Sequence, residues 1–190
     1  MQLRKIGIYG GTFDPIHHAH LILAREALEV LHLEKVIFIP AAISPFKAAP
    51  AASAEMRLSM LKVAIEGEPR FSIDDCELRR EPPSYTFDTV KEIRRREEKA
   101  EIYYLIGSDN LAGLPNWYRF KELEKMVQFI ILDRTGNQIS HSFPTVARKL
   151  DISATDIRKR VALGQSIRYL VPPAVEEIID QGQLYREQGK

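Results

Sequence analysis

Short apolar runs alternate along this chain with longer stretches in which apolar residues recur at helical spacing. The first two runs are Arg4 to Tyr9 and Val36 to Ile39, and between them apolar residues repeat every three or four positions from Leu21 to Leu31. A strand, a helix and a second strand in this order form a βαβ unit with parallel strands. The alternation therefore predicts an α/β fold in which helices wrap a parallel sheet.

The later elements are predicted from the same two periodicities and from glycine and proline signals at helix ends. We expect helices over Ser53 to Ile65, Thr86 to Lys99, Thr155 to Leu163 and Pro172 to Ile179, and extended segments over Phe71 to Leu78, Ile102 to Ile106 and Val127 to Leu132. The last two helices predict a small C-terminal helical part. Because no linker or repeat interrupts the 190 residues, we expect a single domain over residues 1–190.

Composition excludes several classes of partner. Lys and Arg total 27 against 26 Asp and Glu, so no overall field attracts nucleic acid or an anionic membrane. No apolar run approaches the roughly 20 residues that span a bilayer, and no signal-type stretch follows Met1 to Lys5. The single cysteine, Cys76, is expected to be a small buried side chain in a reducing compartment. We expect a soluble, cytoplasmic protein without nucleic-acid or membrane partners, and the sequence leaves a homo-oligomer open.

The strongest chemical signal is the segment GGTFDPIHHAHL, which runs from Gly10 to Leu21 and joins the first predicted strand to the first helix. Open α/β sheets bind ligands at the carboxyl ends of their strands. Gly10 and Gly11 let the backbone approach a phosphate, and N–H groups at the helix start favour an anion. His17 and His20 are three residues apart, so both can face one ligand from the first helical turn. A zinc-protease pattern is absent, since it needs histidines four apart with a glutamate between them.

The whole string resembles the (H/T)xGH signature of the nucleotidyltransferase superfamily, whose members transfer a nucleotidyl group from a nucleoside triphosphate to a phosphate-bearing acceptor. The resemblance implies a Rossmann-like, doubly wound parallel sheet and direct attack of the acceptor phosphate on the α-phosphorus of ATP. It makes His17 and His20 the candidates for stabilising the transferring phosphoryl group. Ala19 stands where the family has glycine, so its methyl group could crowd a phosphate.

A second signature, ISATDIR, runs from Ile152 to Arg158. By itself Ser153 or Thr155 would be an ordinary helix cap. The stretch resembles the superfamily's ISxTxIR motif, which implies that Arg158 is a catalytic residue on the β- and γ-phosphates. The GSD sequence at Gly107 resembles the family's IGxD turn, whose aspartate could bind ribose. The implied ATP site comprises Gly10, Gly11, Thr12, Phe13, His20, Gly107, Asp109, Ser153, Thr155 and Arg158.

Two further segments concern the acceptor. SYTFDT, from Ser84 to Thr89, resembles the SYTxDT signature of nicotinate mononucleotide adenylyltransferases, and backbone N–H groups of a helix start suit a carboxylate. Plain helix capping by Ser84 or Thr86 is the alternative. LPNWY resembles the family's LPxWY pattern, which implies that Trp117 stacks on the pyridine ring. A purely structural role for this tryptophan, at the surface or in the core, is the alternative.

Two positively charged side chains complete the implied acceptor site. The loop PAAISPFK resembles the family's PxxxPxHK, whose lysine reaches phosphate, so Lys47 is a candidate even though Phe46 stands where histidine is common. Arg134 occupies the place of a family arginine near phosphate, with Thr135 where proline is usual. The implied substrate-binding residues are Lys47, Ser84, Tyr85, Thr86, Trp117 and Arg134.

The resemblance covers residues 5 to about 172 and implies an enzyme that joins ATP and nicotinate mononucleotide into nicotinate adenine dinucleotide, releasing pyrophosphate. Mg²⁺ is the expected metal, carried on the ATP phosphates without a protein metal site. Phosphopantetheine adenylyltransferase shares the first and last motifs and is the main alternative. A non-catalytic nucleotide-binding regulator would keep the glycines but lose a histidine or Arg158.

Overall fold

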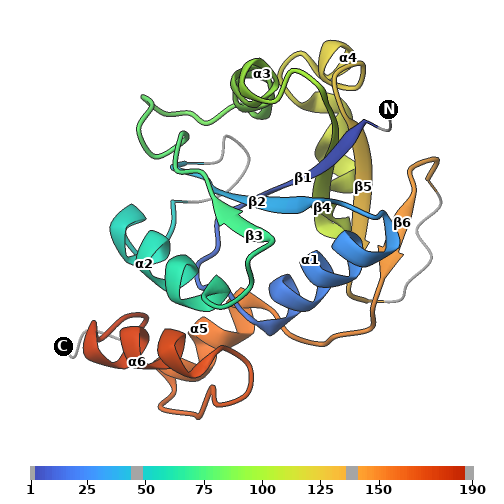
Figure 1. Ribbon diagram of the computed structural model, residues 1–190. Helices are drawn as coiled ribbons and strands as arrows, with labels where there is room; N and C mark the ends of the chain where they lie inside the picture. The colour runs from blue at the N-terminus through green and yellow to red at the C-terminus, as the bar shows by residue number, and fades with distance from the viewer. Residues whose placement is uncertain (1–2, 44–48, 136–140, 187–190) are drawn as a thin grey trace.

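The protein is described by a computed structural model that covers residues 3–43, 49–135 and 141–186. Its strands form one sheet in the order β3-β2-β1-β4-β5-β6, and every neighbouring pair is parallel (Figure 1). This is the strand order of doubly wound, Rossmann-type sheets, so the predicted fold class is confirmed. The strands are β1 (Arg4–Gly11), β2 (Lys35–Pro40), β3 (Phe71–Ile73), β4 (Ala100–Gly107), β5 (Gln128–Asp133) and β6 (Thr145–Ala147).

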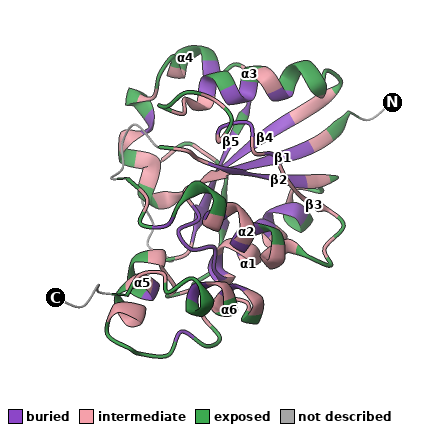
Figure 2. Ribbon diagram, turned by 90° about the vertical axis from the view of Figure 1, so that its left-hand side faces the viewer, coloured by how far each residue is buried: buried purple, intermediate pink, exposed green. Residues whose placement is uncertain are grey.

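Helices cover both faces of the sheet (Figure 1). One face carries α1 (His18–Val30) and α2 (Ala54–Ile65), and the C-terminal helices α5 (Ala154–Ala162) and α6 (Pro173–Gln181) pack into the same apolar cluster. The other face carries α3 (Thr86–Arg96), α4 (Phe120–Leu123) and the 3₁₀ helix η1 (Ser108–Asn116). Figure 2 shows the buried strands running between these two layers. No described helix is long and apolar enough to cross a membrane.

The sheet's switch point lies between β1 and β4. From these two neighbouring strands the chain winds outward in opposite directions, through β2 to β3 and through β5 to β6. In such sheets the crevice for a ligand opens at the carboxyl ends of the two central strands. Here those ends are Gly11 and Gly107, and both begin segments that the sequence singled out.

Local chemistry sets most helix ends where the sequence predicts them. The Ser53 hydroxyl accepts a hydrogen bond from the Met56 N–H at 3.2 Å and caps α2. Beyond the ends of α2 and α5, Gly67 and Gly164 have φ values of +83° and +66°, a conformation that favours glycine. Cys76 is buried, as expected.

The expectation of an extended segment from Phe71 to Leu78 is wrong beyond Ile73. The Asp74 carboxylate accepts a hydrogen bond from the Cys76 N–H at 3.0 Å, and this local turn ends β3. Three elements, η1, α4 and β6, were not predicted. The turn expected at residues 107–109 continues into the 3₁₀ helix η1, which ends next to Trp117.

Candidate active site

Two adjoining clefts open at the carboxyl ends of β1 and β4. We call the first, with about 1250 Å³ of empty space, the polar cleft; it is lined chiefly by residues 9–14, 17, 20, 49–51, 107–110, 134, 153–155 and 158. We call the second, with about 700 Å³, the aromatic cleft; it is lined by residues 10–12, 41, 77, 84–86, 104, 106, 110, 117 and 118. Gly10, Gly11, Thr12 and Asn110 line both, so the end of β1 is the place where the two clefts meet.

His17 and His20 stack against one another in the polar cleft. Their ring centroids are 3.7 Å apart at an interplanar angle of 22°, and the His17 N–H donates to Nδ1 of His20 at 3.3 Å. Burial and then the nearby charge of Arg134 lower the pKa of His17 to about 3, so its imidazole is neutral at pH 7 and carries one N–H donor. Its buried Nδ1 has no hydrogen-bond partner among the described residues.

The structure brings Arg134 and Arg158 into the same cleft from distant parts of the chain. One guanidinium nitrogen of Arg158 donates to the Asp14 carbonyl at 2.7 Å, and one of Arg134 donates to the Ile152 carbonyl at 2.7 Å. Within the described ranges neither arginine pairs with a carboxylate. Each guanidinium has five N–H donors, so both retain donors for an anion. The Ser153 hydroxyl accepts from the Asp156 N–H at 3.1 Å, the predicted cap of α5.

Aromatic rings form the walls of the second cleft. Trp117 contacts Tyr104 edge to face, with ring centroids 6.1 Å apart. The ring centroids of Tyr85 and Tyr118 are 4.7 Å apart. Trp117 is half-buried, since it also packs against Phe129 at 6.3 Å. Its indole therefore serves the core and lines the cleft at once.

The start of α3 lies at this cleft without a side-chain cap. Tyr85 is the N-cap residue and makes no capping bond, while the Ser84 hydroxyl accepts from the Ala42 N–H at 3.3 Å and the Thr86 hydroxyl lies 3.4 Å from that of Tyr104. Plain capping by Ser84 or Thr86 is thus not what the structure contains. Among the described residues, none accepts from the N–H groups of Tyr85 and Thr86, which leaves donors at the positive end of a helix.

The paired glycines leave room for neighbouring protein side chains. A Cβ atom on Gly10 would lie 2.3 Å from the Tyr104 hydroxyl, and one on Gly11 would lie 2.9 Å from the Phe13 ring. The start of α1 is also partly occupied, because the His18 N–H donates to the Leu170 carbonyl at 3.0 Å.

Nearly all the predicted site residues line one of the two clefts. The ATP set lines the polar cleft, and Ser84, Tyr85, Thr86 and Trp117 line the aromatic cleft. Arg134, grouped with the acceptor residues in the prediction, lies instead among the ATP set. Lys47 and Phe46 lie outside the described residues.

Asp14 has a structural role that the sequence did not indicate, although it lies inside the segment from Gly10 to Leu21. Its buried carboxylate accepts from the N–H groups of Ala51 and Ala52, at 2.7 and 3.1 Å, and from the Tyr185 hydroxyl at 2.7 Å. One side chain thereby ties the wall of the polar cleft to the C-terminal segment.

Arg57 was also missed, because nothing in its own helix marks it. Among the described residues it is the largest fully buried side chain. It donates to the carbonyls of Thr12 and Ala41 at 2.7 Å and of Ala42 at 3.3 Å. These carbonyls lie on the loops that follow β1 and β2, so Arg57 holds the two loops together beside both clefts.

Residues 8–160 match the family described as cytidylyltransferase-like. The chain is 43% identical to a protein of Geobacillus thermodenitrificans described as a probable nicotinate-nucleotide adenylyltransferase, over 95% of this chain and 86% of the relative. It is 42% identical to the protein of the same description from Exiguobacterium sibiricum, over 95% and 98% of the two chains. The chain belongs to the nicotinate-nucleotide adenylyltransferase family. The resemblance drawn from the motifs is thereby confirmed.

Solved structures agree on the fold. The Plasmodium falciparum nicotinic acid mononucleotide adenylyltransferase complexed with NaAD superimposes with a TM-score of 0.82 at 21% identity, over 96% of this chain and 97% of that one. Its complex with APC gives a TM-score of 0.80 at 20% identity, over the same shares. At this identity the likeness bears on the fold, which is the doubly wound sheet described above.

Proposed function

We propose that this protein transfers the adenylyl group of ATP to nicotinate mononucleotide. A phosphate oxygen of the mononucleotide attacks the α-phosphorus of ATP, the new P–O–P bond forms, and the bond to the β-phosphate breaks. The products are nicotinate adenine dinucleotide and pyrophosphate, a step of NAD biosynthesis that we assign to the cytoplasm. Family membership supports this reaction, and one structural observation carries it.

That observation is the meeting of two chemically different clefts at the end of β1. The polar cleft offers two arginines and two histidines, which suit a triphosphate, and the aromatic cleft offers flat rings, which suit a pyridine. Residues 10–12 line both. Two substrates bound in this way would bring the acceptor phosphate and the α-phosphorus together at the shared wall, and such positioning supplies much of the catalysis in phosphoryl transfer.

In this proposal the side chains divide by cleft. Arg158 binds the β- and γ-phosphates, and Arg134 binds phosphate beside it. His17 and His20 donate to the oxygens of the transferring phosphoryl group, where charge changes during the reaction. In the aromatic cleft Trp117 stacks on the pyridine ring. The N–H groups of residues 85 and 86 receive its carboxylate.

The residues of the polar cleft are suited to anions more than to a resident metal. The described part of the chain holds no cluster of three or more His, Cys, Asp or Glu side chains that could hold an ion. In this proposal ATP brings Mg²⁺ on its own phosphates, as is usual for this ion.

The direct test offers ATP with three acceptors in parallel and measures pyrophosphate release. We expect turnover with nicotinate mononucleotide, much slower turnover with nicotinamide mononucleotide, and none above background with phosphopantetheine. Preferred use of phosphopantetheine would refute the assignment of the acceptor. Absence of release with every acceptor, from a protein that unfolds cooperatively, would refute adenylyl transfer itself.

A further inference from the structure

A buried carboxyl group lies in the cleft that we assign to the acceptor. Glu77 is 5% exposed, and it is the only Asp, Glu, Lys or Arg among the described residues that line the aromatic cleft. A carboxylate facing a carboxylate-bearing substrate would repel it unless its charge is engaged elsewhere. The contacts of Glu77 show where it is engaged.

Glu77 is tied to the acceptor turn, residues 84–86, through Thr89. The hydroxyl of Thr89, in the first turn of α3, donates to Oε1 of Glu77 at 2.7 Å, and Thr89 is fully buried. Burial raises the pKa of Glu77, whereas the hydrogen bond from the Thr89 hydroxyl lowers it. The Thr89 hydroxyl also lies 3.4 Å from the Tyr85 carbonyl, so one hydroxyl links the Glu77 carboxyl group to the turn.

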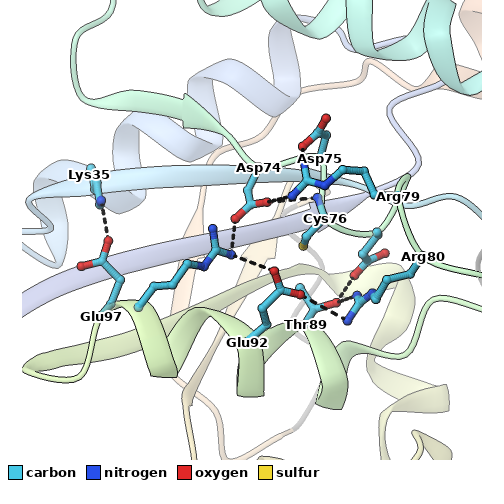
Figure 3. Close-up of polar contacts among 11 residues, drawn as sticks. Lys35, Asp74, Asp75, Cys76, Arg79, Arg80, Thr89, Glu92 and Glu97 are labelled. Carbon is cyan, nitrogen blue, oxygen red and sulfur yellow. Dashed lines mark hydrogen bonds and ion pairs between the residues drawn. The ribbon is translucent and has the colours of Figure 1, made fainter.

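Charge compensation comes from Arg80 and Arg96, which line neither cleft, and Figure 3 shows Arg80 beside Thr89 and Glu92. Arg80 donates to the Thr89 hydroxyl and lies 3.8 Å from the Glu92 carboxylate. Arg96 then connects Glu92, at 3.6 Å, with Asp74. Because Asp74 lines neither cleft, this network runs from a purely structural carboxylate at one end to Glu77 at the other.

We infer that Glu77 is a positioning residue for the acceptor: it holds the turn of residues 84–86 so that the N–H groups of Tyr85 and Thr86 stay aimed at the substrate carboxylate. The inference rests on the proposed function. Its support is geometric, since no side chain caps the start of α3, and the Thr89 hydroxyl links Glu77 to the Tyr85 carbonyl within the turn. Glu77 does not touch the reacting phosphates in this account.

The test compares Glu77→Ala, Glu77→Gln and the matched control Asp74→Asn, which changes the buried carboxylate at the other end of the network. Hydrogen bonds to charged groups are worth enough that Glu77→Ala should raise the KM for nicotinate mononucleotide by on the order of 10–100-fold. The KM for ATP should stay within about twofold, because Arg134, Arg158 and the histidines are untouched. Glu77→Gln keeps one carbonyl acceptor, so we expect a smaller rise, about threefold to tenfold.

A second readout follows binding without turnover. The chain has one tryptophan, so quenching of Trp117 fluorescence reports the Kd for nicotinate mononucleotide. We expect this Kd to rise in parallel with the KM in both Glu77 variants and to stay unchanged in Asp74→Asn, whose loss should appear only as a lower Tm. Should Glu77→Ala fail to fold, Thr89→Val removes the donor to Glu77 and is expected to show the same selective rise.

Three results would overturn the inference. They are equal changes in both KM values, an unchanged KM for the mononucleotide in a folded Glu77 variant, and a rise of the same size in Asp74→Asn. Failure of the proposed function would instead appear in the wild-type protein, as no turnover with nicotinate mononucleotide and no quenching by it. The two failures are therefore distinguishable.

Discussion

Replacing Gly10 by alanine tests why a glycine ends β1. The added Cβ would lie 2.3 Å from the Tyr104 hydroxyl and 3.2 Å from the ring carbon that bears it. Overpacking of this kind typically costs about 1–3 kcal/mol, so Gly10→Ala should lower the free energy of unfolding by that amount. Removing the hydroxyl with Tyr104→Phe leaves the 3.2 Å contact as the nearest, which a shift of a few tenths of an ångström relieves.

The double variant Gly10→Ala/Tyr104→Phe should therefore be more stable than Gly10→Ala alone. Tyr104→Phe by itself loses only the 3.4 Å contact with Thr86, at a cost of about 0.5–1.5 kcal/mol. We expect a favourable coupling energy of about 1–2 kcal/mol in a double-mutant cycle measured by urea unfolding. We also expect the KM values of the double variant, for ATP and for nicotinate mononucleotide, to lie within a few-fold of wild type. Two results would contradict this reasoning: strictly additive changes in the free energy of unfolding, or a double variant whose stability is restored while its KM for ATP stays strongly raised. Either would show that Gly10 makes room for a bound phosphate and not for Tyr104.

Four further outcomes are expected. His17→Ala and His20→Ala should each lower kcat by on the order of 10²–10³-fold in steady-state assays with the fold intact; near-normal kcat in either would remove that histidine from catalysis. Trp117→Ala should raise the KM for the mononucleotide alone, by the equivalent of ~1–3 kcal/mol, whereas equal effects on both KM values would make the indole structural. Two charge-assisted bonds from Tyr85 and Thr86 predict that nicotinate mononucleotide is preferred over the amide by on the order of 10²–10⁴ in kcat/KM, and a ratio near one would contradict this. The pKa of His17 in the folded protein, about 3, lies below its ordinary value of 6.5. Between these two pH values the unfolded chain binds a proton that the folded chain does not. The contribution to the free energy of unfolding is therefore full above pH 6.5 and falls as the pH drops. Urea unfolding should show about 2 kcal/mol of this loss between pH 7 and 5 in wild type and none of it in His17→Gln.

The fold and most of the candidate site follow from signals local to the sequence. Alternating apolar runs predict the parallel sheet, and the histidines, the ISATDIR stretch and the tryptophan each lie within a few residues of a recognisable string. The sheet then brings their segments together, because the carboxyl ends of parallel strands share one edge.

Residues that act through distant partners could not be found in this way. Arg57 looks like an ordinary helical arginine until the loops after β1 and β2 place three carbonyls around it. Glu77 and Thr89 likewise depend on a contact between a turn and a helix. The short elements were missed for a related reason, since η1, α4 and β6 are too brief or too irregular to show a hydrophobic period.

In the proposed reaction, the two clefts that meet at the end of β1 hold the two halves of one dinucleotide. A crystal structure of the protein with nicotinate adenine dinucleotide tests it most directly. We predict the pyridine ring against Trp117 with its carboxylate at the N–H groups of Tyr85 and Thr86, and the adenylyl phosphate beside His17 and His20. A dinucleotide bound wholly within the polar cleft, or with its pyridine ring away from Trp117, would contradict the account.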